Sequence, residues 1–340
     1  MIPSSFQQKI YDEIRDGTGS LVIEAVAGSG KTTTIVEAAK SLKPGGTYVA
    51  ISFNKAIAES LQSRMPYYVR SSTFHSLCFD ALKQHLQRAE GGRRSPKVDA
   101  NKTKWILKDD ASVSDSESWE LLPFVSKLVS FAKGETTKPE DVDFESIIEY
   151  HDLEEPDDLR RALRIARLVL LGSFDDRTRV DFDDMLWLTY QLNVPFAQRA
   201  DVLFIDEAQD LNSVQIALLE RILKPTSSEA AGEDADSEEP NYKDGVICPP
   251  RRLLPPSGRL IAVGDRHQAI YGFRGARSDG LDEIQKRFAA KTLPLSVSYR
   301  CSQAVVAEAQ RALEGYTQPP LKLLGKMRVI DFEPEPDLFD

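Results

Sequence analysis

A glycine-rich turn between an apolar run and a helical pattern constrains this 340-residue chain more than any other feature. The turn reads AVAGSGKT over residues 25–32 and follows the apolar run Leu21–Ala25, which is typical of a buried strand. Apolar residues then recur at helical spacing through Thr32–Leu42, so the pattern predicts strand, turn and helix in succession. Gly28 and Gly30 allow backbone N–H groups to turn inward around phosphate oxygens, and the helix N-terminus adds partial positive charge.

Two side chains of the turn would complete a triphosphate site. Lys31 has the length to reach β- and γ-phosphates, and the Thr32 hydroxyl is a ligand for Mg²⁺. Residue 25 is Ala where the strict pattern has Gly, so the pattern is relaxed at one position. The sequence therefore predicts a P-loop that binds ATP and Mg²⁺, with an ordinary glycine-rich turn as the alternative.

Alternation of strands and helices predicts a parallel sheet. Thr47–Ser52 is a second strand pattern, and a helical stretch covers Asn54–Arg64. Strand character returns at Val202–Ile205 and Leu260–Val263. Between the first two strand patterns and the last two, residues 79–192 mix charged and apolar residues at helical periods, most clearly at Arg160–Leu171. This pattern predicts a mostly helical insertion.

A pair of acids ends the third apolar run, in VLFIDEAQD at residues 202–210. A P-loop fold places a second magnesium contact at such a strand end, which assigns Asp206 to the metal. Glu207 would then polarise a water for in-line attack on the γ-phosphate. Alone, an acidic strand end is as often structural, but the P-loop supplies the phosphate that these acids need.

A polar and aromatic block follows the fourth apolar run, in VGDRHQAIYGFRGA at residues 263–276. Gln268 is placed to sense a γ-phosphate. Tyr271, Phe273 and Arg274 form the combination of aromatic and basic side chains that stacks on single-stranded bases without sequence preference. The alternative is that both rings lie in the core.

The net charge of −10 is unevenly distributed. Residues 135–158 carry −10 and residues 226–244 carry −6, which leaves +6 for the rest of the chain and keeps an anionic partner open. Residues 226–258, rich in Ser, Glu, Asp and Pro, predict a mobile acidic loop, with an acidic recognition element as the alternative. No run approaches 18 apolar residues and three distant cysteines form no disulfide or zinc spacing, so we expect no membrane partner and a cytoplasmic, or nuclear or nucleoid, protein.

Taken together, the motifs resemble those of superfamily 1 DNA helicases of the UvrD/Rep/PcrA type, with the F-box helicase branch as the nearest expectation. The resemblance rests on AGSGKTTT, SFNKAIAESL, TFHSL, FIDEAQD, VGDRHQAIYGFRGA and LSVSYR, which occur in family order over most of residues 1–310. The stretch VDFDDML at residues 180–186 also resembles family sequence. The resemblance implies an α/β fold, with a RecA-like P-loop NTPase sheet and a helical inserted subdomain.

The resemblance also assigns roles to individual residues. Gln7 matches an adenine-reading glutamine, with Gln8 as the fallback, and Tyr299 matches an aromatic residue that stacks on adenine. Arg300 matches an arginine finger on the γ-phosphate, and Gln268 would couple nucleotide state to the DNA site. The catalytic set is then Lys31, Glu207, Gln268 and Arg300, and the metal set is Thr32 and Asp206. The nucleotide-binding set is Gln7, Ala27, Gly28, Ser29, Gly30, Lys31, Thr32, Thr33, Tyr299 and Arg300. The DNA-binding set is Phe53, Asn54, Thr73, His75, Tyr271, Phe273 and Arg274.

The C-terminus departs from the family pattern. The family has a second RecA-like domain with two further motifs, and neither occurs in the 40 residues after Arg300. We therefore expect a first RecA-like domain formed by residues 1–78 and 193–300, a helical insertion at 79–192, and a start of a second domain or a tail at 301–340. Residues 327–340 predict one strand and an acidic end. A separate chain that supplies the second RecA-like domain is an expected partner.

Two functions remain in competition. The first is the ATP-hydrolysing part of an ATP-dependent 3′–5′ DNA helicase that acts on single-stranded or partly duplex DNA. The second is a nucleotide-gated DNA-binding module without unwinding activity. A small-molecule kinase on the same P-loop is disfavoured, because it does not need the aromatic block at residues 263–276.

Overall fold

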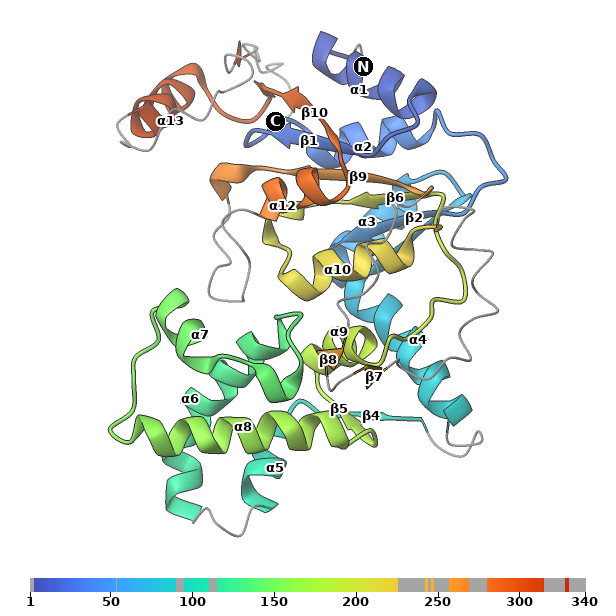
Figure 1. Ribbon diagram of the computed structural model, residues 1–340. Coiled ribbons are helices and arrows are strands. Elements are labelled where there is room, and N and C mark those ends of the chain that lie inside the picture. The colour runs from blue at the N-terminus through green and yellow to red at the C-terminus, as the bar shows by residue number, and fades with distance from the viewer. Residues whose placement is uncertain are drawn as a thin grey trace, which may run out of the picture.

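A six-stranded parallel sheet lies in the upper half of the computed structural model, above the helices of the insertion (Figure 1). The structure describes residues 3–52, 54–89, 95–109, 115–225, 242–243, 246–247, 257–268, 280–314 and 328–329. The strands lie in the order β10 (Lys291–Leu295), β1 (Leu21–Ala25), β9 (Arg259–Gly264), β6 (Val202–Ile205), β2 (Tyr48–Ser52) and β3 (Val69–Thr73). Neighbouring strands pair in parallel throughout this sheet, so the predicted α/β fold of a RecA-like domain is confirmed.

Both faces of the sheet are covered, which explains why its strands appear as continuous apolar runs. In β1, Leu21 and Ile23 enter one hydrophobic core, and Val22 enters the other. The first core lies under α1 (Ser5–Asp16), α2 (Lys31–Ala39) and α3 (Lys55–Arg64). The second lies under α10 (Ser213–Ile222) and α12 (Gly280–Arg287) and continues into the insertion.

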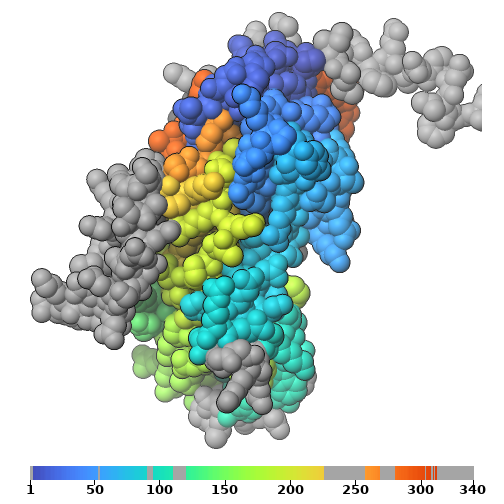
Figure 2. Space-filling model, turned by 90° about the vertical axis from the view of Figure 1, so that its right-hand side faces the viewer, coloured from blue at the N-terminus to red at the C-terminus, as the bar shows by residue number. Residues whose placement is uncertain are grey.

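The insertion lies at the opposite end of the molecule from α1, and Figure 2 shows the blue N-terminal residues and the cyan and green insertion at the two ends. Its elements are β4 (Lys97–Val98), α5 (Lys102–Asp109), α6 (Asp115–Lys133), η1 (Pro139–Asp141), α7 (Phe144–Tyr150), α8 (Leu159–Asp175), β5 (Arg179–Val180) and α9 (Phe182–Gln191). The helix α4 (Phe74–Ala89) runs from the sheet into this region without interruption across residues 78 and 79. The boundary that we propose there therefore marks a change of neighbours and not a break in the backbone.

A buried ionic network fixes the start of α9. Lys102 Nζ lies 2.6 Å from Asp184 Oδ2, and Lys133 Nζ lies 2.6 Å from Asp181 Oδ2 and 2.9 Å from Asp184 Oδ1. The side chains of both lysines are at most 1% exposed. Removing one partner of such a network leaves an uncompensated buried charge, which costs about 3–5 kcal/mol. The network therefore holds the first turn of α9, including Phe182, at a defined place.

Beyond the sheet, β11 (Val297–Ser298) pairs in parallel with β12 (Arg328–Val329), which confirms the strand expected near residue 327. The helix α13 (Gln303–Glu314) lies between them in the chain. Most of the predicted acidic loop at 226–258 lies outside the described residues, apart from a short antiparallel pair of β7 (Tyr242–Lys243) and β8 (Val246–Ile247). Among the helices that the structure describes, none has the length and apolar character needed to span a membrane.

Candidate nucleotide and nucleic-acid site

The residues that the sequence assigns to nucleotide and metal converge where the strands of the sheet have their carboxyl ends. β1, β9 and β6 are neighbours, and the P-loop, Asp265 and the Asp206–Glu207 pair follow their carboxyl ends. In open parallel sheets this edge is where ligands bind. Residues far apart in the sequence therefore share one site because the strands are parallel and adjacent.

The backbone of the P-loop adopts a conformation that requires glycine at two positions. Gly28 and Gly30 have φ values of +72° and +79°, in the left-handed region. A Cβ atom on Gly28 would also lie 2.4 Å from Cβ of Arg300. Gly30 is the N-cap of α2, so the free N–H groups of the first helical turn lie directly after the loop.

The P-loop contacts both strand-end acids directly. Lys31 Nζ lies 2.6 Å from Glu207 Oε2, and the Thr32 hydroxyl donates a 2.9 Å hydrogen bond to Asp206 Oδ2. These are the four residues to which the sequence assigned phosphate, water and metal. The Lys31 side chain is 12% exposed and that of Glu207 is 33% exposed, so the pair lies at the floor of an accessible site.

Negative charge is concentrated at this floor. Burial and the neighbouring Glu207 raise the pKa of Asp206, and the same two causes raise the pKa of Asp210 to about 6. Lys31 opposes both pKa shifts. Glu207 itself has a φ of +53°, a conformation that costs a non-glycine residue about 1–3 kcal/mol. The site therefore holds like charges that a cationic ligand would offset, next to a residue with a strained backbone.

Asp210 gives a testable pH dependence of stability. Its pKa in the folded chain lies above the ordinary 3.8, so the folded state binds this proton more tightly than the unfolded state. The resulting stabilisation is present below about pH 4 and is lost as the pH rises through about 6. We expect Asp210→Asn to melt at a higher temperature than the wild type at pH 7 and at nearly the same temperature near pH 4, measured by calorimetry. Exposed Asp157→Asn is the control; equal melting of wild type and Asp210→Asn at pH 7 would contradict the assignment.

The loop also contains a buried donor that is free for a ligand. Ser29 is fully buried, and its Oγ has no hydrogen-bond partner among the described residues. Thr32 and Asp206 lie together as hydroxyl and carboxylate, a set that suits Mg²⁺ bound mainly by phosphates and water. In the described part of the chain, no group of three or more His, Cys, Asp or Glu residues forms a metal cage. The residues present thus fit a magnesium ion that arrives with a nucleotide.

The segment at residues 298–300 packs against the P-loop. The Ser298 hydroxyl donates to the carbonyl oxygen of Ala27 at 2.8 Å, and the Tyr299 N–H donates to that of Gly28 at 2.9 Å. The Tyr299 hydroxyl lies 3.5 Å from Gln7 Oε1. The side chain of Arg300 begins at the loop and is exposed. The structure therefore brings Tyr299 and Arg300 to the P-loop from the chain that follows β10.

The two glutamines that compete for the adenine role differ in their surroundings. Gln7 is 7% exposed, and its Nε2 donates to the Thr34 hydroxyl of α2 at 3.3 Å. Gln8 is exposed and bonds to Asp12 within its own helix. Gln7 is thus the one that lies beside the P-loop helix. Thr33 lies on the same helix, where its hydroxyl accepts from Arg64 at 3.0 Å.

Gln268 lies in the short helix η4 (Arg266–Gln268) after β9. Its Nε2 donates to Asp265 Oδ2 at 2.7 Å. Burial raises the pKa of Asp265, and the charge of Lys31 opposes that rise, which places Asp265 within electrostatic reach of the P-loop. The predicted phosphate sensor is therefore held by Asp265, at the carboxyl end of the strand that pairs with β1.

The expected DNA-binding residues fall into two groups. Phe53, Tyr271, Phe273 and Arg274 lie outside the described residues. Asn54 and Thr73 accept hydrogen bonds from the first turns of α3 and α4, from Ile57 N and Ser76 N. His75 is half-buried, and burial lowers the pKa of its imidazole, so it presents a neutral ring.

The comparisons with known proteins decide the family. Residues 6–289 match the UvrD/REP helicase N-terminal domain. The chain belongs to this family.

Similar proteins include two bacterial helicases. One is the ATP-dependent DNA helicase PcrA of Staphylococcus epidermidis, 25% identical over an alignment of 328 residues; the match covers 89% of this chain and 39% of the relative. Another is the ATP-dependent DNA helicase UvrD1 of Mycobacterium tuberculosis, 27% identical over an alignment of 319 residues; the match covers 86% of this chain and 37% of the relative. The chain thus spans about two fifths of the relatives that it matches. These matches do not support placement in the F-box branch.

One exposed aromatic residue of this UvrD-family domain is missing from the set that the sequence predicts. Phe182, 57% exposed at the start of α9, lies edge-on to His75 with ring centroids 6.2 Å apart. An exposed ring beside a neutral imidazole is the kind of surface on which bases stack. A signal for it exists in VDFDDML, where Phe182 stands next to acids that the structure pairs with lysines.

One small cavity of this UvrD-family domain is lined by residues from both predicted sites. The cavity has a volume of about 20 Å³, and its lining includes Ser52, His75, Ile205 and Asp206. The metal-assigned acid and the DNA-assigned histidine therefore line the same cavity.

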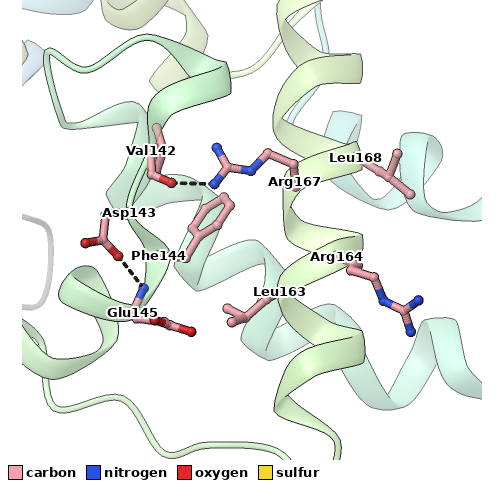
Figure 3. Close-up of a pocket in the computed structure, with 8 residues that line it drawn as sticks. All are labelled: Val142, Asp143, Phe144, Glu145, Leu163, Arg164, Arg167 and Leu168. Carbon is pink, nitrogen blue, oxygen red and sulfur yellow. Dashed lines mark hydrogen bonds between the residues drawn. The ribbon is translucent and has the colours of Figure 1, made fainter.

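A separate cavity of about 580 Å³ lies in the insertion between α7 and α8 (Figure 3). Arg167 spans it, donates to the carbonyl oxygen of Val142 and covers the Phe144 ring at 4.7 Å. Arg167 also donates to the carbonyl oxygens of Pro139 and Glu140, so its guanidinium holds the loop before α7 in place. None of the residues assigned to nucleotide, metal or DNA lines this cavity.

Proposed function

We propose that this chain binds ATP with Mg²⁺ and hydrolyses it, as the nucleotide-binding part of a helicase or translocase that moves 3′–5′ along single-stranded DNA. The observation that carries the proposal is the direct contact of Lys31 with Glu207 and of Thr32 with Asp206. Membership of the UvrD/REP family supports the same reaction. Because the chain spans about two fifths of its relatives, unwinding by the whole protein, with a second RecA-like domain in the same or a separate chain, is part of the proposal.

The proposed reaction gives a task to each of the four residues in these contacts. Thr32 and Asp206 would hold a magnesium ion, and the ion would supply positive charge that stabilises the phosphate oxygens. Lys31 leaves its ion pair with Glu207 and binds the phosphates instead. Glu207 then accepts hydrogen bonds from a water, takes its proton as the oxygen bonds to the γ-phosphorus, and ADP leaves with the electrons of the broken bond.

The single strand would lie over the His75 side of the sheet edge. We propose Phe182 as a stacking residue there, with Phe53, Asn54, Thr73, Tyr271, Phe273 and Arg274 as the other contacts of the strand. Because the pKa of His75 is lowered by burial, His75 contributes aromatic surface and not charge at pH 7. Stacked bases on neutral rings give binding without sequence preference.

Phe182→Ala tests this part of the proposal. Loss of one stacked base costs about 1–3 kcal/mol, so we expect the Kd for fluorescent oligo(dT) to rise by roughly 5- to 150-fold. Trp105→Ala is the matched control, since Trp105 is another exposed aromatic residue of the insertion, 42% accessible, on the helix α5. Equal affinities of wild type and Phe182→Ala, measured by fluorescence anisotropy, would remove Phe182 from the strand path.

Steady-state phosphate release with and without single-stranded DNA tests the function as a whole. The proposal predicts ATP hydrolysis that single strands stimulate. Binding of both ligands without turnover would instead indicate a nucleotide-gated DNA-binding module. Phosphorylation of a metabolite would revive the kinase interpretation.

A further inference from the structure

A single buried glutamine connects the two acidic strand ends of the site. Gln209, in the short helix η2 (Ala208–Asp210), is 3% exposed. Its Nε2 donates to Glu207 Oε2 at 3.0 Å and to Asp210 Oδ2 at 3.2 Å. Its Oε1 accepts from the backbone N–H of Asp265 at 3.0 Å. Both amide hydrogens and the amide oxygen are therefore used, toward acids on one side and β9 on the other.

The orientation of this amide is fixed by chemistry. A backbone N–H can only donate, so the oxygen of Gln209 must face Asp265. The NH₂ group must then face Glu207 and Asp210, which accept when ionised. Gly264 makes the approach possible, because a Cβ atom at that position would lie 2.6 Å from Gln209 Oε1.

The glutamine shares its acceptor with the P-loop lysine. Lys31 Nζ and Gln209 Nε2 both donate to Oε2 of Glu207. When Lys31 turns to phosphates, one of these two donors leaves that oxygen. On the other side, Asp265 bonds to two glutamines. Its backbone N–H donates to Gln209, and its Oδ2 accepts a 2.7 Å hydrogen bond from Gln268. The described hydrogen bonds therefore run without a gap from Lys31 to Gln268.

We propose that Gln209 is a positioning residue that transmits the state of Glu207 to the segment after β9, and so to Gln268. The proposal rests on the proposed function for the identity of the ligand that moves Lys31. The coupling itself does not depend on the proposed function, because the hydrogen bonds of the ligand-free chain define it. Gln209 itself touches no substrate and acts only through Glu207 and Asp265.

Hydrogen exchange of the amides at residues 264–268, measured by mass spectrometry on the full ligand-free chain, tests the coupling. Glu207→Ala should speed this exchange roughly two- to tenfold, the range that the loss of one hydrogen bond allows. The same substitution should have no further effect in a Gln209→Met background. A Gln215→Met background is the matched control, because Gln215 is also buried but caps α10, so there the response to Glu207→Ala should remain as in the wild type.

Two outcomes overturn the proposal: an equal response to Glu207→Ala with and without Gln209→Met, or no response in the wild-type background. If Gln209→Met does not fold, Gln209→Glu at pH 8 replaces it, since it keeps the acceptor for Asp265 N–H and removes the donor to Glu207. It should likewise abolish the response.

Addition of a non-hydrolysable ATP analogue with Mg²⁺ separates this inference from the proposed function. On saturation the wild type should show a change in the exchange of the Asp265 amide, the group that Gln209 holds, and Gln209→Met should bind the analogue with similar affinity and show no such change at that amide. A change at Gln268, the proposed phosphate sensor, is expected in both proteins. A Gln209→Met chain that still shows the full change would overturn the inference. A wild-type chain that binds no analogue would refute the proposed function, and the ligand-free measurement would still decide the role of Gln209.

Discussion

Glu207→Gln is expected to stop ATP hydrolysis and to leave ATP binding intact or tighter. A glutamine cannot take the proton of the attacking water, and general-base catalysis of this kind is worth roughly 10²–10⁴-fold in kcat. The ion pair between Glu207 and Lys31 at 2.6 Å competes with phosphate for the lysine. Removing that competitor should lower the Kd for ATP.

The measurement combines phosphate release with equilibrium titration of a fluorescent ATP analogue. Glu37→Gln, an exposed acid on α2, is the control and should retain both activities. Turnover at the wild-type rate in Glu207→Gln would show that another group activates the water. Weaker binding of the analogue would show that the Lys31–Glu207 pair does not compete with the nucleotide.

Lys31→Ala is expected to remove most of the nucleotide affinity. A hydrogen bond to a charged group is worth about 1.5–3 kcal/mol, so we expect the Kd for Mg·ATP to rise by roughly 10- to 150-fold. Turnover should fall further, because the lysine also neutralises charge that develops on the phosphate oxygens. Titration calorimetry measures the first effect, and phosphate release measures the second.

The structure supplies a close control for this variant. Lys40 follows α2 and forms an exposed ion pair with Glu37, so Lys40→Ala removes an equal charge next to the same helix. It should bind Mg·ATP as the wild type does. If both lysine variants bind equally well, the P-loop assignment is wrong.

Sequence patterns predicted the parts of the fold in which local and tertiary preferences agree. The apolar runs at Leu21–Ala25 and Val202–Ile205 became β1 and β6 with the same bounds, because both strands are buried on both faces. The contacts of Lys31 and Thr32 with the acids follow from parallel strands whose carboxyl ends meet at one edge. The order of strands and turns along the chain is therefore enough to place the residues of these motifs together.

Other features depend on neighbours that the sequence does not show. β10 contains Pro294, which obscures a strand pattern and is tolerated because β10 is an edge strand. The exposure of Phe182 depends on lysines from α5 and α6 that hold the acids around it. The role of Gln209 depends on the approach of Gly264 from another strand. Long-range packing decides each of these, and no local period encodes it.

The most direct test asks whether nucleotide binding changes the affinity for single-stranded DNA. It measures the Kd of labelled oligo(dT) with and without a saturating non-hydrolysable ATP analogue and Mg²⁺. We predict that the Kd for the oligonucleotide changes when the analogue is present in the wild type and that Lys31→Ala abolishes the change. An identical Kd for the wild type in both conditions, with the analogue shown to be bound, would contradict the account.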